Sequence, residues 1–220
     1  MSDYTLVIGN KNYSSWSLRP WLLMRHAGID FTEVRIPLYT PESKQQIRHY
    51  SPSGKVPCLL DGDLAVWDSL AIAEYLAERH PALKLWPSDA AQRAHARSIS
   101  AEMHSGFANL RSRMSMNCRG RFPGHGRSVE VAGEIDRIQR IWGECRERHA
   151  HAGPFLFGQF CIADAMYAPV ALRFRTYEVQ LNPVNRGYAD AILALPAMQR
   201  WLAEAEAEIE VIAAFEPQPA

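Results

Sequence analysis

Hydrophobic and polar positions in the first fifty residues follow two different periods. Residues 5–9 (TLVIG) form a short apolar run that predicts a buried strand, and residues 31–36 (FTEVRI) alternate apolar and polar side chains as a half-buried strand does. Residues 18–27 carry the spacing of a helix, with Pro20 tolerated in its first turn, and residues 42–50 predict a short polar helix. Strands and helices therefore alternate from the start of the chain.

Residues 58–60 and 64–67 are two apolar runs that flank an Asp-Gly pair. Such a pair accepts positive φ at low cost and is favoured in two-residue turns, so the runs predict a β-hairpin with Asp61 and Gly62 at its tip. Residues 70–79 then place apolar side chains at helical spacing. The expected order is strand, helix, strand, helix, strand, strand, helix.

From about residue 88 the pattern is helical throughout. Helices are expected over residues 89–116, 128–149, 162–177, 188–193 and 196–208. Residues 119–127 are too rich in Gly and Pro for a helix and predict an exposed loop, and residues 217–220 are expected to fray. The chain therefore divides into an α/β domain over residues 1–82, a linker over 83–88 and an all-helical domain over 89–220.

Charge and composition argue against several classes of partner. The 220 residues include 24 Lys and Arg and 24 Asp and Glu, so the net charge is zero and no overall positive field attracts nucleic acid or anionic lipid. No apolar run reaches the roughly 18 to 20 residues of a membrane-spanning helix, and the first residues lack the pattern of a signal peptide. We expect a cytoplasmic protein with neither a nucleic acid nor a membrane as partner.

The four cysteines, Cys58, Cys118, Cys145 and Cys161, are scattered along the chain and form no CxxC pair. This spacing suits a reducing compartment better than a disulfide framework. Cys145 and His149 share one face of a predicted helix, yet no further thiol or carboxylate completes a zinc site there. We therefore expect no bound metal.

The candidates for chemistry begin with residues 13–17 (YSSWS), between the first strand and the first helix. Backbone amides at a helix start point outward and favour a negative charge, so this turn is suited to hold an anion. A serine before a helix is also a common N-cap, and the sequence leaves both roles open.

Two further segments allow either a purely structural role or a role in binding a ligand. Pro57 stands at the start of the first hairpin strand, where it removes an amide from the ladder. A cis peptide there would turn the backbone of Val56 outward toward a bound peptide, whereas the alternative is an ordinary proline at a strand start. Asp68 and Ser69 precede the helix at 70–79, and they either cap it or bind the carboxylate and ammonium of an amino acid.

Taken in order, these segments resemble the cytosolic glutathione S-transferases, and they are most similar to the zeta and related serine-type classes. The segments are Ser14-Ser15-Trp16-Ser17-Leu18-Arg19, Lys55-Val56-Pro57 and Asp68-Ser69, ahead of a helical domain. The resemblance implies a thioredoxin-like N-terminal domain, glutathione as co-substrate, and a homodimer.

The resemblance also implies roles for individual residues. The residues implied to bind glutathione are Lys55, Val56, Pro57, Asp68 and Ser69. Val56 would pair through its backbone with the cysteinyl part of glutathione before a cis Pro57, and the last two residues would hold the γ-glutamyl end. Ser14 would face the sulfur as the catalytic residue. Ser15 is the alternative donor, because a one-residue shift of the helix start would exchange the two serines.

A fourth match lies before the predicted helix at 162–177, where residues 157–164 (FGQFCIAD) resemble the family's helix-start signature. Cys161 replaces the usual Ser or Thr, and a thiol is a weaker hydrogen-bond partner than a hydroxyl. Only the Asp164 half of the capping box is therefore expected to work fully. We assign Asp164 a structural role rather than a catalytic one.

The chemistry that the resemblance implies begins with ionisation of the glutathione thiol. A thiol with a pKa near 8.5 is only a few per cent ionised at neutral pH. A hydrogen bond from Ser14 and the nearby helix start would together lower that pKa by roughly 1 to 3. Serine forms no mixed disulfide, so conjugation, isomerisation or peroxide reduction is favoured over thiol-disulfide exchange.

The second substrate is expected to bind between the two domains. The candidate lining residues are Trp16, Phe107, Arg111, Met114 and Arg175, of which the apolar ones fit a core equally well. Arg173 and Arg175 lie roughly where zeta relatives present an arginine to an acidic substrate. The alternative for both arginines is a solvated or ion-paired position on the surface.

Three functions remain open at this point. The leading hypothesis is transfer of glutathione to small hydrophobic electrophiles. A second is a glutathione-dependent cis-trans isomerase of the maleylacetoacetate type, for which an arginine presented to a dicarboxylate would be the distinguishing feature. A third is a binding or stress-interaction protein that keeps the fold without turnover.

Overall fold

The computed structural model describes residues 4–216, so the expected fraying of residues 217–220 lies outside the described residues. Its strands are β1 (Tyr4–Ile8), β2 (Thr32–Arg35), β3 (Cys58–Asp61) and β4 (Leu64–Trp67). They form one sheet in the order β2-β1-β3-β4, in which β1 runs parallel to β2 and antiparallel to β3, and β3 runs antiparallel to β4. The mixed sheet is the one that a thioredoxin-like domain requires.

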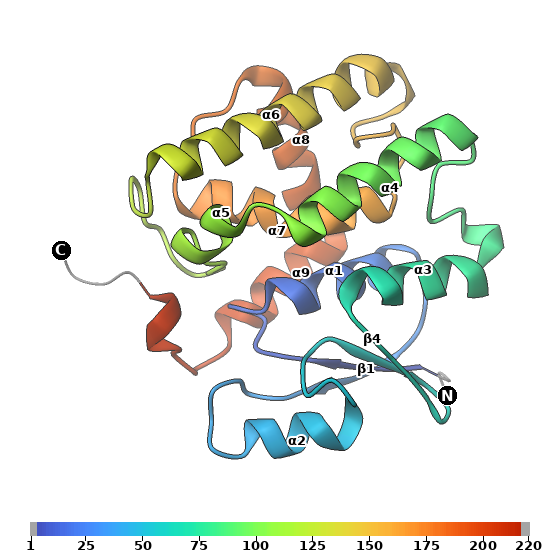
Figure 1. Cartoon of the computed structure of the whole chain (residues 1–220), viewed down its shortest axis with the longest axis vertical. Coiled ribbons are helices and arrows are strands. Elements are labelled where there is room, and N and C mark those ends of the chain that lie inside the picture. The colour runs from blue at the N-terminus through green and yellow to red at the C-terminus, as the bar shows by residue number, and fades with distance from the viewer. Residues whose placement is uncertain (1–3, 217–220) are drawn as a thin grey trace.

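Helices cover both faces of this sheet. They are α1 (Ser15–His26), α2 (Ser43–Tyr50) and α3 (Ser69–Arg79). Figure 1 shows α1 and α3 on the face toward the rest of the molecule and α2 alone on the opposite face. The alternation of β1 explains this arrangement, because Leu6 and Ile8 join the large core, whereas Val7 packs in a small cluster with Ile47 of α2.

The remainder of the chain is helical. Its helices are α4 (Ala90–Ser105), α5 (Ala108–Arg113), α6 (Val129–His149), α7 (Ile162–Thr176), α8 (Pro183–Leu193) and α9 (Pro196–Glu206), with single 3-10 turns at Pro81–Leu83, Ala150–Ala152 and Ala213–Phe215. The central helix α7 is almost entirely buried and packs against α1 and α4. The predicted α/β domain followed by an all-helical domain is confirmed, while the boundaries at 82 and 89 stay a prediction.

The prediction of one continuous helix over residues 89–116 is wrong, because the structure has two helices there, α4 and α5. The break lies at Gly106 and Phe107, where Phe107 adopts a positive φ of 56°. Apolar residues continue at helical spacing across the break, with Met103, Phe107 and Leu110 all buried, so periodicity alone conceals it.

Three other predicted boundaries also move. Helix α1 begins at Ser15, so Pro20 lies in the interior of the helix rather than in its first turn. Helix α8 begins at Pro183, after the N-cap Asn182, instead of at residue 188. The two-residue loop of the hairpin is Gly62-Asp63, because Asp61 pairs with Leu64 as the last rung of the sheet. Gly62 takes the positive φ, 57°, that the turn demands.

Lys11 joins the two halves of the molecule. Its side chain is 5% exposed, and its ammonium group forms ion pairs with Glu33 of β2 and Glu204 of α9. The same group lies over the rings of Trp21 and Trp201, 5.1 and 5.6 Å from their centroids. The first loop of the chain is thereby connected to its last helix.

Residues 4–216 contain neither a membrane-spanning helix nor a cluster of metal ligands. No helix there is long and apolar enough to cross a membrane. In the same residues, no group of three or more His, Cys, Asp or Glu side chains is placed to hold a metal ion.

Candidate active site

The site is built around the start of α1, where Ser14 is the N-cap residue. Its hydroxyl caps no amide of the helix, and instead it donates a hydrogen bond of 2.8 Å to Oγ of Ser17. Ser17 Oγ also accepts from the amide of Gly9, at 3.1 Å. The single proton of Ser14 is thus directed into the turn. The amides of Trp16 and Ser17 donate to no described residue and are available to an anion.

Ser15 has a different partner. Its oxygen lies 3.3 Å from Nη2 of Arg173, which donates to it from α7. Arg173 is itself buried, and its Nε donates to the carbonyl oxygen of Met114 at 2.8 Å. Burial lowers the pKa of Arg173 to about 10, where the group is still a cation at neutral pH. Because the Ser15 oxygen accepts from this cation, its own proton is free to be donated to an anion.

Two arginines lie over the ring of Trp16. The guanidinium carbon of Arg19 lies 4.3 Å from the ring centroid and that of Arg111 lies 5.5 Å from it. Arg19 also donates to Oγ of Ser69 at 3.3 Å. Burial and the neighbouring positive charges of Arg173 and Arg111 lower the pKa of Arg19 to about 9. Several arginine side chains close together at a largely buried position favour the binding of a negatively charged ligand.

Asp68 has the capping role that the sequence left open, and its role in binding glutathione stays a prediction. It is the N-cap of α3, where Oδ1 accepts from the amides of Leu70 and Ala71 at 2.9 and 3.3 Å. Its second oxygen, Oδ2, lies 3.2 Å from Nε2 of His104 on α4. The side chain of Asp68 is 41% exposed, so Oδ2 remains accessible to a ligand. The cap fixes the carboxylate while one oxygen points away from the helix.

His104 was not among the residues that the sequence predicted. Its ring packs edge-on against Trp16 at a centroid distance of 5.3 Å, and its Nδ1 is buried with no hydrogen-bond partner. A buried nitrogen without a partner is the unprotonated one in the arrangement that costs least, so we assign the proton of the neutral ring to Nε2. No motif in the sequence signals this residue, since Asp68 and His104 meet only after α3 and α4 pack together.

The peptide bond between Val56 and Pro57 is cis, as the resemblance implied. The backbone of Val56 forms no hydrogen bond to another described residue, so both its N–H and its C=O are available to an extended peptide. Lys55 is exposed, and its amide donates to Oγ of Ser53 at 3.2 Å.

The residues predicted to line the electrophile pocket do not all come together. Trp16, Arg111 and Met114 lie around Arg173 and Arg19, and Phe107 is buried at the break between α4 and α5. Arg175 instead donates to the carbonyl oxygen of Cys118 at 3.0 Å and lines another hollow. The structure therefore brings Arg173, and not Arg175, to the serines.

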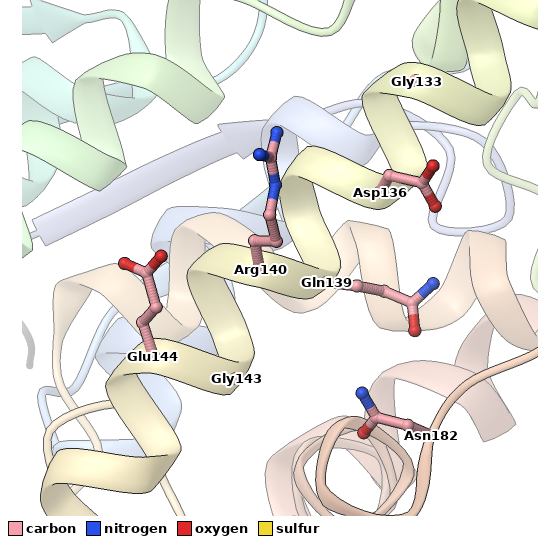
Figure 2. A pocket seen from close by; sticks show the side chains of 7 residues that line it. All are labelled: Gly133, Asp136, Gln139, Arg140, Gly143, Glu144 and Asn182. Atoms are coloured by element: carbon pink, nitrogen blue, oxygen red, sulfur yellow. The ribbon is translucent and has the colours of Figure 1, made fainter.

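Two other features lie apart from this site. A hollow of about 780 Å³ runs along one face of α6, and Figure 2 shows its polar side chains; none of the residues around Trp16 lines it.

Asp164 is fully buried and accepts from the amides of Cys161 at 2.8 Å and Leu156 at 3.0 Å. Burial raises its pKa to about 6. These bonds are those of a structural cap.

A thioredoxin-like domain with an open helix start, a cis-proline and a capping carboxylate, joined to a helical domain, defines the class of the protein. Two family models match the chain: "Glutathione S-transferase, N-terminal domain" over residues 13–79 and "Glutathione S-transferase, C-terminal domain" over residues 128–204.

Named relatives and a solved structure agree with these matches. A probable maleylacetoacetate isomerase of Vibrio cholerae is 41% identical over 166 residues, which cover 69% of this chain and 73% of that protein. One of Caenorhabditis elegans is 29% identical over 180 residues, covering 78% and 80%. The crystal structure of a glutathione transferase homolog from Burkholderia GL BGR1, with bound glutathione, is 26% identical with a TM-score of 0.68 and covers 94% of this chain and 99% of that one.

The chain belongs to the cytosolic glutathione S-transferase family, whose members include glutathione-dependent enzymes. The resemblance found in the sequence is therefore confirmed. The roles of the individual site residues stay predictions.

Proposed function

We propose that this protein binds glutathione between the start of α1, the backbone of Val56 and the carboxylate of Asp68, and adds its ionised sulfur to an unsaturated substrate that carries a carboxylate. The observation that carries the proposal is the position of Arg173, a buried cation 3.3 Å from the hydroxyl of Ser15. An arginine facing an acidic substrate is the feature that distinguishes an isomerase of the maleylacetoacetate type from a transferase for apolar electrophiles.

The thiolate is stabilised by the groups at the start of α1. A hydrogen bond to a charged group contributes about 1.5 to 3 kcal/mol, and a helix start contributes about 0.3 to 1 kcal/mol. Each pKa step of 1 corresponds to about 1.4 kcal/mol. Ser15 is the better placed donor, because it accepts from Arg173 and keeps its own proton, whereas the proton of Ser14 is donated to Ser17.

The reaction follows from these groups and from a conjugated double bond in the substrate. The thiolate forms a C–S bond with one carbon of the double bond, and the π electrons move to the conjugated carbonyl oxygen. The remaining C–C single bond rotates, the electrons return, and the C–S bond breaks to release the thiolate and the trans isomer. Arg19, Arg111 and Arg173 supply positive charge for the substrate carboxylate and for the charge that develops on the carbonyl oxygen.

Transfer to apolar electrophiles remains the second candidate function, because the partly exposed ring of Trp16, next to Ser15 in the chain, offers apolar surface. The test gives the enzyme glutathione with maleylacetoacetate and, separately, with a neutral aryl halide. We expect cis-trans conversion of the dicarboxylate with no consumption of glutathione. Conjugation of the aryl halide alone would overturn the isomerase and support the transferase, and turnover of neither substrate would support a binding protein.

We also propose that two copies associate in the cytoplasm. Strand β4 is an edge strand, and its side chains Leu64 and Trp67 are 49% and 46% exposed, which favours a partner surface. The four cysteines are all free and buried, in keeping with a reducing compartment. Sedimentation of the purified protein at two concentrations tests the dimer, and a monomer at both would contradict it.

A further inference from the structure

The C-terminal segment, defined as residues 207–216, lies against the loop that precedes the serines. It follows α9 and is drawn in red in Figure 1. The loop, residues 10–13 (NKNY), connects β1 to Ser14. Segment and loop are almost two hundred residues apart in the sequence, yet several of their groups are in direct contact.

The principal contact is the carboxylate of Glu208. Its Oε1 accepts from the amide of Lys11 at 2.7 Å, and its Oε2 accepts from the amide of Asn12 at 3.0 Å. Two successive amides that point toward one anion form a nest, a common way for backbone to bind a negative charge. The Glu208 side chain is only 6% exposed, and Arg35 approaches Oε1 to 3.3 Å.

This nest is the centre of the turn that positions Ser14. The carbonyl oxygen of Asn10 accepts from the amide of Tyr13 at 3.2 Å and from that of Ser14 at 2.8 Å. Lys11 and Asn12 are therefore the two central residues of the turn, and Glu208 binds the peptide groups of both. The orientation of those peptide groups determines where Ser14 and the first turn of α1 lie.

Other contacts hold the C-terminal segment in place. The guanidinium of Arg119 donates to the carbonyl oxygens of Glu208 and Glu210, the latter at 2.8 Å. Further along, the hydroxyl of Tyr13 donates to the carboxylate of Glu216 at 2.6 Å. The segment thus has its own anchors, and Glu208 is the group through which it acts on the turn.

We propose that Glu208 is a positioning residue for thiol activation, through which the C-terminal segment sets the geometry of the α1 start. This inference rests on the proposed function. A glutamine at position 208 would keep one acceptor oxygen, but its NH₂ group would face the second amide, donor against donor. The turn would then lose one of its two bonds to the segment, and the serines would lose their fixed position.

The test compares Glu208→Gln with Glu210→Gln. Both carboxylates contact Arg35, and only Glu208 contacts the amides of the loop. The thiol pKa of bound glutathione is measured from thiolate absorbance during a pH titration, together with kcat and the melting temperature. We expect Glu208→Gln to raise the thiol pKa toward its value in free glutathione and to lower kcat about tenfold near neutral pH. Glu210→Gln should leave both quantities unchanged.

Two results would overturn the inference. One is a thiol pKa in Glu208→Gln equal to that of the original protein. The other is an equal change of the thiol pKa in Glu208→Gln and Glu210→Gln. If Glu208→Gln does not fold, Arg119→Met replaces it, because methionine donates to neither carbonyl oxygen of the segment. An unchanged thiol pKa in that variant would also reject the inference. A thiol that is not ionised in the original protein would refute the proposed function instead.

Discussion

The two serines at the start of α1 are distinguished by their hydrogen-bond partners. Ser14 donates to Ser17, whereas Ser15 accepts from Arg173 and has no acceptor for its own proton among residues 4–216. A donor that is already oriented by a cation needs less rearrangement to stabilise an anion than one that must first break an internal bond. These hydrogen bonds therefore favour Ser15 as the donor to the thiolate, whereas the sequence favoured Ser14.

This difference predicts unequal effects of two alanine substitutions. Ser15→Ala should reduce kcat/KM by about tenfold or more, since a hydrogen bond to a charged group is worth about 1.5 to 3 kcal/mol. Ser14→Ala should reduce it by about threefold or less, because the proton it removes serves Ser17. Steady-state rates at saturating glutathione measure both. The reverse order would return the catalytic role to Ser14.

His104 predicts a pH dependence of glutathione binding. Burial lowers its pKa below 6.5; the charges of Arg19 and Arg111 act in the same direction, while Asp68 opposes them. As the pH falls through this lowered pKa, His104 becomes a cation and pairs with Asp68, in competition with the γ-glutamyl ammonium that we propose Asp68 binds. KM for glutathione should therefore rise in acid and stay constant above about pH 7.

The control for this prediction is His104→Gln, which keeps a donor near Asp68 but does not titrate. KM for glutathione is measured between about pH 5 and pH 8 in both proteins. The acid rise should disappear in the variant. A rise of the same size in both would assign the effect to another group.

At the scale of elements, local signals identified the hairpin and the start of α3, because turn residues and caps act over a few positions. The cis peptide before Pro57 was implied by the family resemblance and not by a local signal. The break between α4 and α5 and the early start of α8 were missed. Apolar spacing continues across Gly106, and the chain turns there because Gly106 is extended and Phe107 is left-handed. The contacts of Arg173 with Ser15 and of His104 with Asp68 depend on how helices pack, which no local pattern encodes.

Replacing Gly106 at this break is expected to change the stability of the fold. A Cβ at this position would lie 2.7 Å from the carbonyl oxygen of Glu102, closer than atoms tolerate. Gly106→Ala should lower the free energy of unfolding by about 1 to 3 kcal/mol. Gly133→Ala is the matched control, since nothing lies within 4 Å of a Cβ there and α6 should gain about 0.5 to 1 kcal/mol. Urea unfolding of both variants measures the difference, and equal stabilities would contradict it.

At the scale of the whole molecule, Lys11 connects the sheet domain to α9 through Glu33 and Glu204. Breaking a fully buried ion pair on one side costs about 3 to 5 kcal/mol. The two carboxylates here are 22% and 33% exposed, and solvent reduces the cost. Lys11→Met should therefore lower the free energy of unfolding by about 2 kcal/mol.

The control for Lys11 uses the same carboxylate. Arg200 pairs with Glu204 at 2.8 Å but is 55% exposed, so Arg200→Met should change the free energy of unfolding by less than about 0.5 kcal/mol. Urea titration of both variants provides the comparison. Similar losses in the two would show that burial of Lys11 is not what makes its ion pairs strong.

The contacts of Glu208 and Glu216 have a consequence for synthesis. Both side chains bind the loop beside the serines, which is made about two hundred residues before them. A nascent polypeptide whose residues 207–216 still occupy the ribosomal exit tunnel is unable to form these contacts, even when its sheet has already folded. Completion of this part of the molecule therefore has to wait until those residues have emerged from the ribosome.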